Sequence, residues 1–380
     1  MTSRVRTTKS AKVAGSSLGD STKGLAARRA FFHEMTGRQL RRLFEEAVHR
    51  LDPGRLVRQR LARGDFRPSR VLAVGKAAQS MVDGCPQDWP RLVISPHPAR
   101  DAQEVESSHP MLTPASYEAG RRLLDFLQDD TLLLLVSGGA SALVEVCPPG
   151  QEPWIEGWSR LYGAGLDIVS MNQERARHSA IKGGRLLDFL RAPSLTLLLS
   201  DVLQGPQWVG SGLTWRSPQP SEHRVEVLAD AGSLVEEMVR GLAHYRCLVQ
   251  EPLTGSLEQA RQLIQGWAPE PGEAVLAAAE VTVAVSGPGV GGRCQHLAAS
   301  LVEWLRDKPY LLLAGASDGV DGRTPVPCAG ACVDGSFPEA RPFLQRQDSY
   351  HYFCSTGELW SPGPTGNNLN DLIILLNPRT

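Results

Sequence analysis

The sequence has no long apolar stretch of the kind that crosses a membrane. Its longest purely aliphatic runs are short, for example residues 132–136 and 311–313, whereas a spanning helix needs about 20 mostly apolar residues. It also has no excess of one charge, because 40 Lys and Arg stand against 41 Asp and Glu. Nucleic-acid-binding proteins commonly carry a global basic bias, which this chain lacks, although a local basic patch stays open. We therefore expect neither a membrane nor a nucleic acid as a partner.

The sequence is also poor in cysteine patterns that bind metal. Its seven cysteines include no CxxC pair, and the nearest two, Cys328 and Cys332, have no histidine or second pair beside them. Zinc sites need such clustered ligands, so we do not expect one. Reduced and mostly buried thiols favour a cytoplasmic protein.

The first 29 residues differ in composition from the rest of the chain. They contain seven Lys and Arg but a single acidic residue, Asp20, and they lack the apolar core of a secretory signal. We predict a disordered basic tail over residues 1–29. Because transit peptides are also basic and poor in acids, targeting to an organelle is the alternative to a cytoplasmic location.

The remaining chain predicts an α/β fold. Its length allows two to three domains at about 150 residues each. Leu40, Phe44 and Val48 have helical spacing, and buried apolar runs over residues 70–74, 131–136 and 195–199 alternate with helical patterns. Such runs are typical of a parallel sheet covered on both faces. We place a domain boundary so that residues 30–255 form the N-terminal domain and residues 256–380 the C-terminal domain. The C-terminal strands are expected over residues 281–285, 310–314, 329–333, 351–354 and 372–376.

Residues that follow the strands are candidates for chemistry, because ligands bind at the carboxyl ends of parallel strands. Gly75 and Lys76 follow the first strand, in a pattern that is not a P-loop. The glycine-rich segment 137–143 follows the next one and could bind an anion through backbone N–H groups, or could serve close packing only. Asp201 follows the third strand and is a candidate base or metal ligand.

Two further motifs lie in the second half. Residues 286–293 form a glycine-rich loop that ends in Arg293, a potential clamp for phosphate or carboxylate, and that does not match the GxGxxG dinucleotide fingerprint. Asp318 and Asp321 stand three residues apart in a glycine-rich turn. They could hold Mg²⁺ together with substrate phosphates, or they could be solvated acids of a turn.

Taken in sequence order, these motifs resemble those of the glycerate 2-kinases whose C-terminal part is called the MOFRL family. The resemblance runs from about Leu40 to Leu376. Its nine motifs are residues 74–78, 109–110, 137–143, Asn172 with 181–186, 199–202, 211–214, 291–293, 318–322 and 364–372. Each is common alone, but nine in sequence order are specific.

The resemblance implies a larger Rossmann-like N-terminal domain with helices on both faces of a parallel sheet, a smaller C-terminal α/β domain, and an active site in the cleft between them. It implies transfer of the γ-phosphoryl group of ATP to the 2-hydroxyl of D-glycerate with Mg²⁺, by a monomer or homodimer. The catalytic residues implied are Lys76, Asp201 and Arg293, with Asp318 and Asp321 as metal ligands. Nucleotide or substrate contacts are implied for Gly75, Ser137, Gly138, Gly139, Ser141, Asn172, Lys182, Arg185, Thr365 and Asn370.

Several positions depart from the family pattern. Residues 203–205 replace a Gly-Asp pair, and Cys294 and His296 interrupt an Arg-Asn-Gln-Glu motif. A kinase of a related sugar acid is therefore one alternative, and a non-catalytic member that binds a metabolite or a partner is another. A hydroxypyruvate reductase is less expected, because the dinucleotide fingerprint is missing.

Overall fold

The computed structural model describes residues 35–163 and 168–378, so the tail predicted over residues 1–29 lies outside the described residues. Its first helix, α2 (Gly37–Arg50), confirms the predicted amphipathic helix. The helix begins at a capping box between Thr36 and Gln39, and it buries Leu40, Phe44 and Val48. None of the helices in this part of the chain combines the length and the apolar character needed to cross a membrane.

The first lobe contains a six-stranded parallel sheet in the order β3-β2-β1-β4-β5-β6. Its strands are β1 (Arg70–Val74), β2 (Arg91–Ser95), β3 (Glu104–Glu106), β4 (Leu132–Ser137), β5 (Ser194–Leu199) and β6 (His223–Ala229). Successive residues of β1 enter different cores, because side chains alternate between the faces of a sheet. Val71 and Ala73 pack with α3 (Pro53–Leu61) and α4 (Ala78–Val82), whereas Leu72 and Val74 pack with α5 (Pro114–Phe126) and α6 (Ala140–Leu143). Helices therefore cover both faces, as predicted.

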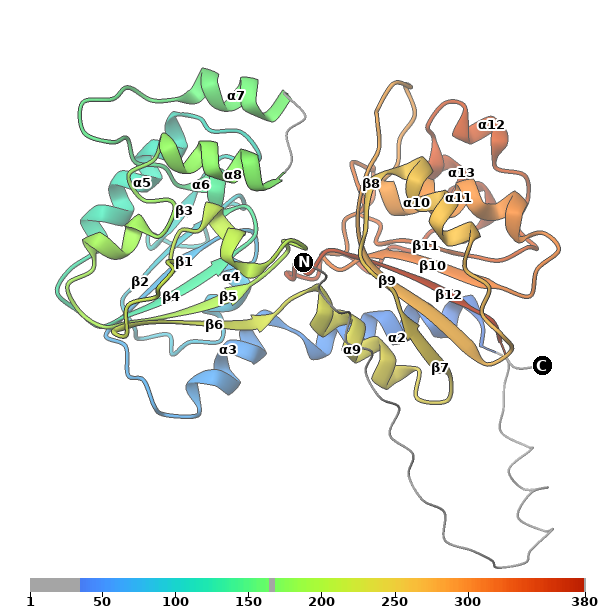
Figure 1. Cartoon of the computed structure of the whole chain (residues 1–380), viewed down its shortest axis with the longest axis horizontal. Coiled ribbons are helices and arrows are strands. Elements are labelled where there is room, and N and C mark those ends of the chain that lie inside the picture. The colour runs from blue at the N-terminus through green and yellow to red at the C-terminus, as the bar shows by residue number, and fades with distance from the viewer. Residues whose placement is uncertain (1–34, 164–167, 379–380) are drawn as a thin grey trace, which may run out of the picture.

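The second lobe contains a mixed sheet in the order β11-β10-β12-β9-β7, with β8 also pairing with β9. Its strands are β7 (Arg246–Val249), β8 (Leu253–Ser256), β9 (Glu273–Thr282), β10 (Leu311–Ala316), β11 (Gly330–Val333) and β12 (Asp371–Leu376). One face carries α10 (Leu257–Gln265), α11 (Arg293–Leu305), α12 (Arg341–Leu344) and α13 (Ser349–Thr356). The other face packs against α2 and α9 (Ala231–Gly241), which run below the sheet in Figure 1.

Three features of the second lobe differ from the expectations. Helices α2 and α9 and strand β7 belong to this lobe although they precede residue 256, and β8 spans the predicted boundary. The two lobes therefore do not divide the chain between residues 255 and 256. The expected strand at 351–354 is part of the helix α13. The expected strand at 281–285 ends at Thr282 and begins at Glu273. Alanine is a poor strand former, so the alanine-rich start of β9 is decided by its neighbours β12, β7 and β8.

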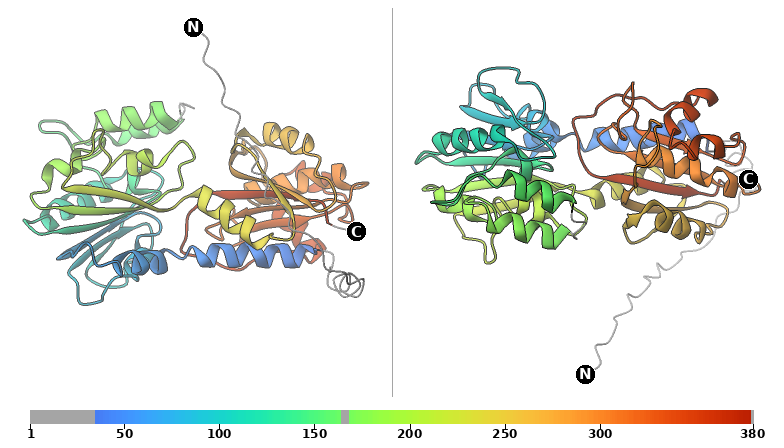
Figure 2. Two further views of the ribbon diagram at one scale, coloured as in Figure 1. Left: turned by 60° about the horizontal axis from the view of Figure 1, so that its bottom comes forward. Right: turned by 90° about the horizontal axis from the view of Figure 1, so that it is seen from above.

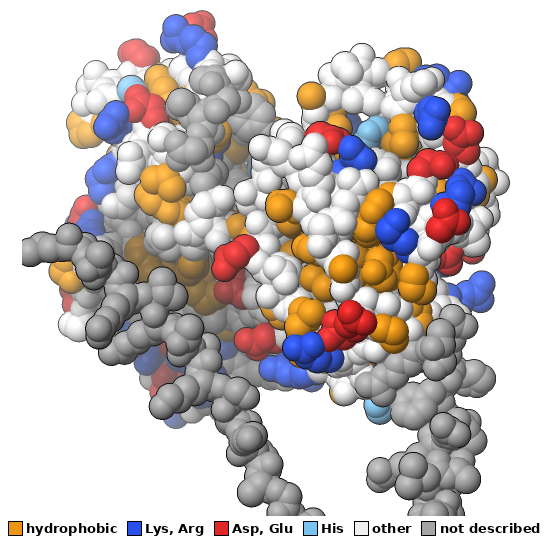
Figure 3. Space-filling model, turned by 45° about the vertical axis from the view of Figure 1, so that its right-hand side comes forward, with side chains coloured by type: hydrophobic (Ala, Val, Ile, Leu, Met, Phe, Trp, Pro, Cys, Tyr) orange, Lys and Arg blue, Asp and Glu red, His pale blue; other side chains and the backbone are white. Residues whose placement is uncertain are grey.

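The two lobes are joined along one side and separated along the other. One hydrophobic core runs from β1, β4 and β5 to β9 and β12 by way of α2, α3 and α9, and Figure 2 shows α2 extending beneath the second lobe. A loop that precedes β12 ties this junction to α2, because Asn367 Nδ2 donates to the carbonyl oxygen of Leu51 at 2.8 Å. On the opposite side the surface is notched between the lobes (Figure 3). The carboxyl ends of the first sheet point toward this junction (Figure 1).

Candidate active site

The loops after β1 and β4 are bound to each other at the carboxyl end of the first sheet. The backbone N–H of Lys76 donates to the carbonyl of Gly138 at 2.8 Å, and the N–H of Ala77 donates to the buried hydroxyl of Ser137 at 3.0 Å. Asp201, after β5, lies so close to Gly138 that a Cβ atom there would stand 1.8 Å from its Oδ2. Glycine at 138 is therefore required by the carboxylate of Asp201. The three strand ends thus bring together residues that are 125 positions apart, from Lys76 to Asp201.

The second lobe reaches the same place from the opposite side. Arg293 is the first residue of α11, and Asp371 is the first residue of β12. They form a two-pronged ion pair, with Nε to Oδ2 at 2.5 Å and Nη2 to Oδ1 at 3.1 Å. Asn368, in the loop before β12, donates from Nδ2 to Oδ2 of Asp201 at 2.6 Å. The lobes therefore meet at the carboxylate of Asp201.

The charges of both lobes act on one another. Glu280, on β9, has its pKa raised to about 7 by desolvation and by the charge of Asp201, while Arg293 and Lys76 act in the opposite direction. Burial raises the pKa of Asp318, with a further contribution from Asp371. We call Lys76, Asp201, Glu280, Arg293, Asp318 and Asp371 the central charged cluster.

The raised pKa of Glu280 predicts a pH dependence of stability. An unfolded glutamate titrates near its ordinary value of 4.5, so between about pH 5 and pH 8 the folded chain binds more protons than the unfolded chain. The free energy of unfolding should therefore fall as pH rises through this window. Although neighbouring atoms crowd Glu280 enough to raise its pKa, the residue keeps exposed surface. Solvent therefore screens its charge, and we expect a fall of less than about 1 kcal/mol.

Urea denaturation at pH 5 and pH 8 measures this change. Glu280→Gln should flatten the dependence, whereas Glu156→Gln, at an exposed position on α7 (Ile155–Gly163), serves as the matched control. Equal slopes in the wild type and in Glu280→Gln would contradict the expectation.

His109 is a further cleft residue whose role the sequence did not indicate. Its ring lies beside Gly139, where a Cβ atom would stand 3.1 Å from His109 Cδ2. Burial, together with the positive charges of Lys76 and Arg175, lowers the pKa of His109 to about 4. The imidazole is therefore neutral at pH 7 and can donate or accept a hydrogen bond without adding charge.

The predicted magnesium pair, Asp318 and Asp321, does not fit that ion. Asp321 is buried, and its two oxygens accept from the backbone N–H groups of Cys294 at 2.9 Å and Gln295 at 2.7 Å. Its carboxylate therefore serves the N-terminus of α11, which a sequence pattern of two acids in a turn does not reveal. Asp318 accepts from the N–H of Val320 at 2.9 Å in a local turn. Across residues 35–163 and 168–378, no group of three or more His, Cys, Asp or Glu could hold a metal ion.

Two basic side chains that the resemblance implied as nucleotide or substrate contacts instead bond to groups within the first lobe. Lys182 is fully buried, its ammonium pairs with the carboxylate of Glu145, and it donates to the carbonyl of Val144 at 3.2 Å. Burial lowers the pKa of Lys182. Arg185 donates from Nε to the carbonyl of Ser179 at 3.1 Å and also bonds that of Ala176. Both side chains stabilise local structure, so the expectation that they contact nucleotide or substrate does not match their geometry.

The buried ion pair gives a testable consequence. Lys182→Met should lower the free energy of unfolding by about 3–5 kcal/mol, because it leaves the charge of Glu145 buried without its partner. Lys182→Met combined with Glu145→Leu should regain most of that loss, as measured by urea denaturation. A single variant with normal stability and lost turnover would instead return Lys182 to the binding site.

The other predicted contact residues shape the loops around the cleft. The hydroxyls of Ser141 and Ser211 bond at 2.8 Å, and Ser211 donates to Oδ1 of Asn172 at 2.8 Å. Thr365 donates to the carbonyl of Ser317 at 2.6 Å. Asn370 has a positive φ of 66°, and its buried Oδ1 has no hydrogen-bond partner in the described part of the chain. That orphaned oxygen is available to a ligand donor.

Several backbone N–H groups of the glycine-rich loop before Arg293 donate hydrogen bonds to side chains of the protein. The N–H groups of Ser286 and Gly287 both donate to Oε1 of Gln347 at 2.7 Å, and the N–H of Val290 donates to Asp348 at 3.2 Å. These amides are therefore occupied, and the loop does not present them to an anion. Its observed effect is to fix the start of α11, where Arg293 stands.

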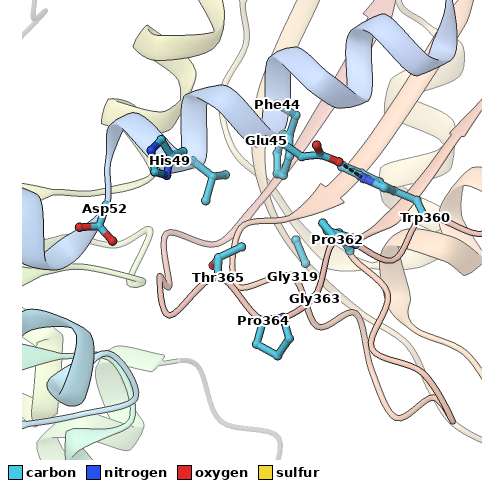
Figure 4. Close-up of a pocket in the computed structure, with 13 residues that line it drawn as sticks. Phe44, Glu45, His49, Asp52, Gly319, Trp360, Pro362, Gly363, Pro364 and Thr365 are labelled. Carbon is cyan, nitrogen blue, oxygen red and sulfur yellow. Dashed lines mark hydrogen bonds between the residues drawn. The ribbon is translucent and has the colours of Figure 1, made fainter.

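A small cavity of about 240 Å³ lies behind the turn at Asp318, between α2 and the loop at residues 360–365 (Figure 4). Its aromatic wall is fixed by two contacts. Trp360 Nε1 donates to Oε1 of Glu45 at 2.7 Å, and the rings of Trp360 and Phe44 meet edge to face at 5.3 Å. These contacts hold α2 against the loop that carries Asn368 into the cleft.

Comparisons with known proteins agree with this architecture. A family model described as "Domain of unknown function (DUF4147)" matches residues 39–245, and one described as "MOFRL family" matches residues 273–371. A D-glycerate 2-kinase of Thermotoga maritima is 27% identical, covering 87% of this chain and 96% of the relative. A glycerate 2-kinase of Sulfurisphaera tokodaii is 29% identical, covering 80% of this chain and 89% of the relative.

Solved structures show the same two lobes. The crystal structure of a glycerate kinase from Thermotoga maritima has a TM-score of 0.75 at 25% identity, covering 88% of this chain and 98% of that chain. A protein from Pyrococcus horikoshii has a TM-score of 0.70 at 22% identity, covering 91% of this chain and 99% of that chain, and supports the fold alone. The domain pair and the relatives define a kinase, a phosphotransferase with an alcohol group as acceptor. The chain belongs to the MOFRL family of glycerate kinases, in which a DUF4147 domain precedes a MOFRL domain.

Proposed function

We propose that this protein transfers the γ-phosphoryl group of ATP to the 2-hydroxyl of D-glycerate, which gives ADP and 2-phosphoglycerate. The observation that carries the proposal is the meeting of Lys76 and Asp201 of the first lobe with Arg293 of the second lobe in one charged cluster. Phosphoryl transfer requires positioning and charge neutralisation more than covalent help from the protein. Two cations and a positioned carboxylate supply these needs.

The proposed roles follow from the contacts of each side chain. Asn368 holds Oδ2 of Asp201, and Oδ1 accepts no hydrogen bond from the described residues, so it can receive the proton of the acceptor hydroxyl. Lys76 and Arg293 neutralise charge on the transferred phosphoryl group. Gly139 and Ser141 keep partial exposure and would border the acceptor and phosphates, whereas the buried Gly75, Ser137 and Gly138 would shape the loops behind them. Magnesium would enter as part of the nucleotide substrate, and no residue of the chain is assigned to it.

The alternatives are separated by chemistry. A reductase would need a dinucleotide, yet the loop at residues 286–293 lacks the fingerprint, and the amides of Ser286 and Gly287 are occupied by Gln347. A related sugar acid could replace glycerate as acceptor, because Cys294 and His296, which depart from the family pattern, directly follow Arg293. A non-catalytic binder would keep nucleotide affinity without turnover.

The test is a coupled ADP-release assay over a panel of hydroxy acids that includes D-glycerate, L-glycerate and sugar acids. Phosphorus NMR of the product distinguishes 2-phosphoglycerate from 3-phosphoglycerate. We expect D-glycerate to give the highest kcat/KM and the 2-phosphate. Turnover with another acid alone would support the sugar-acid alternative, and no turnover with any acid would overturn the kinase proposal.

A further inference from the structure

A second and larger hollow lies beside the central charged cluster and has no assigned role. It has a volume of about 680 Å³ and is bounded by the loop after β5, the helix α9, the turn between β7 and β8, and the strand β9. It is therefore built from both lobes, at the place where α9 lies between them in Figure 2. We call it the α9 groove. Its volume lies within the range of sites that enclose small organic ligands, about 300–1,000 Å³.

The walls of the α9 groove are mainly apolar. They include Val202, Leu203, Val235, Val239 and Val249. Val249 remains 57% exposed. Charged side chains are confined to the α9 side, where Glu236 and Arg240 are exposed. An apolar wall of this kind suits a flat ring system better than a small, polar hydroxy acid with a carboxylate.

The inner end of the groove is lined by residues that neighbour the central charged cluster in the sequence. Ser200 lines the groove, and the next residue is Asp201. Ala278 also lines it, and Glu280 lies two residues further along β9, on the same face of the strand because side chains alternate. A ligand in the groove would therefore point one end toward Asp201 and Glu280, with Lys76 and Arg293 nearby.

We propose that the α9 groove binds the adenine and ribose of the nucleotide, with the phosphates directed toward Lys76 and Arg293. This inference rests on the proposed kinase function, whose two substrates differ sharply in apolar surface. Glycerate consists of a carboxylate and hydroxyl groups on a three-carbon chain, so it cannot cover a wall of valine and leucine. The nucleoside is the part of the reactants that can bury this wall while its phosphates reach the two cations.

Substitutions at Val249 test the contact, because this side chain lines the groove and is exposed enough to change without disturbing a core. Val249→Glu and Val249→Lys should both weaken ADP binding, by about fivefold or more, because either charge replaces an apolar contact with the base. A mere effect of charge on the phosphates would instead move the two variants in opposite directions. Val227→Glu and Val227→Lys, at a valine of β6 that is 40% exposed and does not line the groove, are the matched controls.

Isothermal titration of MgADP without acceptor gives the dissociation constant, and ADP-release kinetics give KM for ATP and for D-glycerate. We expect both Val249 variants to raise the dissociation constant and KM for ATP, with kcat and KM for D-glycerate unchanged. Unchanged affinity, opposite shifts in the two variants, equal losses in the Val227 controls, or a wild type that binds no MgADP would each overturn the inference. Wild-type protein that binds MgADP through Val249 but phosphorylates no hydroxy acid would overturn the kinase proposal while the nucleotide groove stands.

Discussion

Lys76→Met is expected to lower turnover by roughly 100-fold or more, which corresponds to about 2.7 kcal/mol of activation free energy. The backbone of Lys76 is fixed by its bond to Gly138 at 2.8 Å, and its charge acts on Glu280 and Asp318 from the opposite lobe. Methionine keeps the length and the apolar stem but removes the positive charge that the transferred phosphoryl group would meet. The measurement is ADP release at saturating ATP and D-glycerate.

The same substitution at Lys308 supplies the control. The ammonium of Lys308 lies 4.8 Å from the ring centroid of Trp304, after α11, and Lys308 is not part of the central charged cluster. Lys308→Met should therefore leave turnover unchanged. Urea denaturation of both variants separates lost chemistry from lost folding, since Lys76→Met should unfold at nearly the same urea concentration as the wild type. Near-normal turnover in a folded Lys76→Met variant would remove this lysine from the active site.

Arg293→Lys should be nearly as damaging as Arg293→Ala, with each losing about 2 kcal/mol or more of transition-state stabilisation, or roughly 30-fold in kcat/KM. The planar guanidinium pairs with both oxygens of Asp371 and can still direct its remaining N–H groups into the cleft. An ammonium group at this position cannot hold both oxygens and also meet a ligand. The sequence predicted a clamp for phosphate or carboxylate, and the structure shows that the Nε and Nη2 side of the guanidinium is bonded to Asp371.

The kinetic constants identify what Arg293 contacts. A fall in kcat with KM retained is expected if the guanidinium meets the γ-phosphoryl group as charge shifts during transfer. A rise in the KM for D-glycerate with normal kcat would assign Arg293 to the acceptor carboxylate. Full activity of Arg293→Lys would contradict the clamp altogether.

The sequence determined the first lobe and the order of its motifs. The runs at residues 70–74, 131–136 and 195–199 are continuous and apolar, which is the pattern of strands buried on both faces, and β1, β4 and β5 occupy these positions. Carboxyl ends of parallel strands share one edge, so the placement of Lys76 and Asp201 at the same edge of the sheet follows from local patterns. The order β1-β4-β5, which puts their strands close together, is seen only in the structure. A glycine at position 138 indicates that another group packs closely against the backbone there, although the sequence does not show that this group is the carboxylate of Asp201.

Only the tertiary structure decided which side chains face the cleft from the second lobe. Glu280 and Asn368 meet Asp201 across the junction of the two sheets, and Asp371 pairs with Arg293 within the second lobe. No spacing along the chain encodes these distances. The same holds for residues that left the predicted site. Lys182 pairs with Glu145 inside the protein, and Asp321 accepts hydrogen bonds from the N–H groups at the start of α11. A buried charge is stable only when such a partner compensates for its lost hydration. The sequence therefore specified the strands and the reactive residue types, while the packing of one lobe on the other selected which of those residues face the cleft.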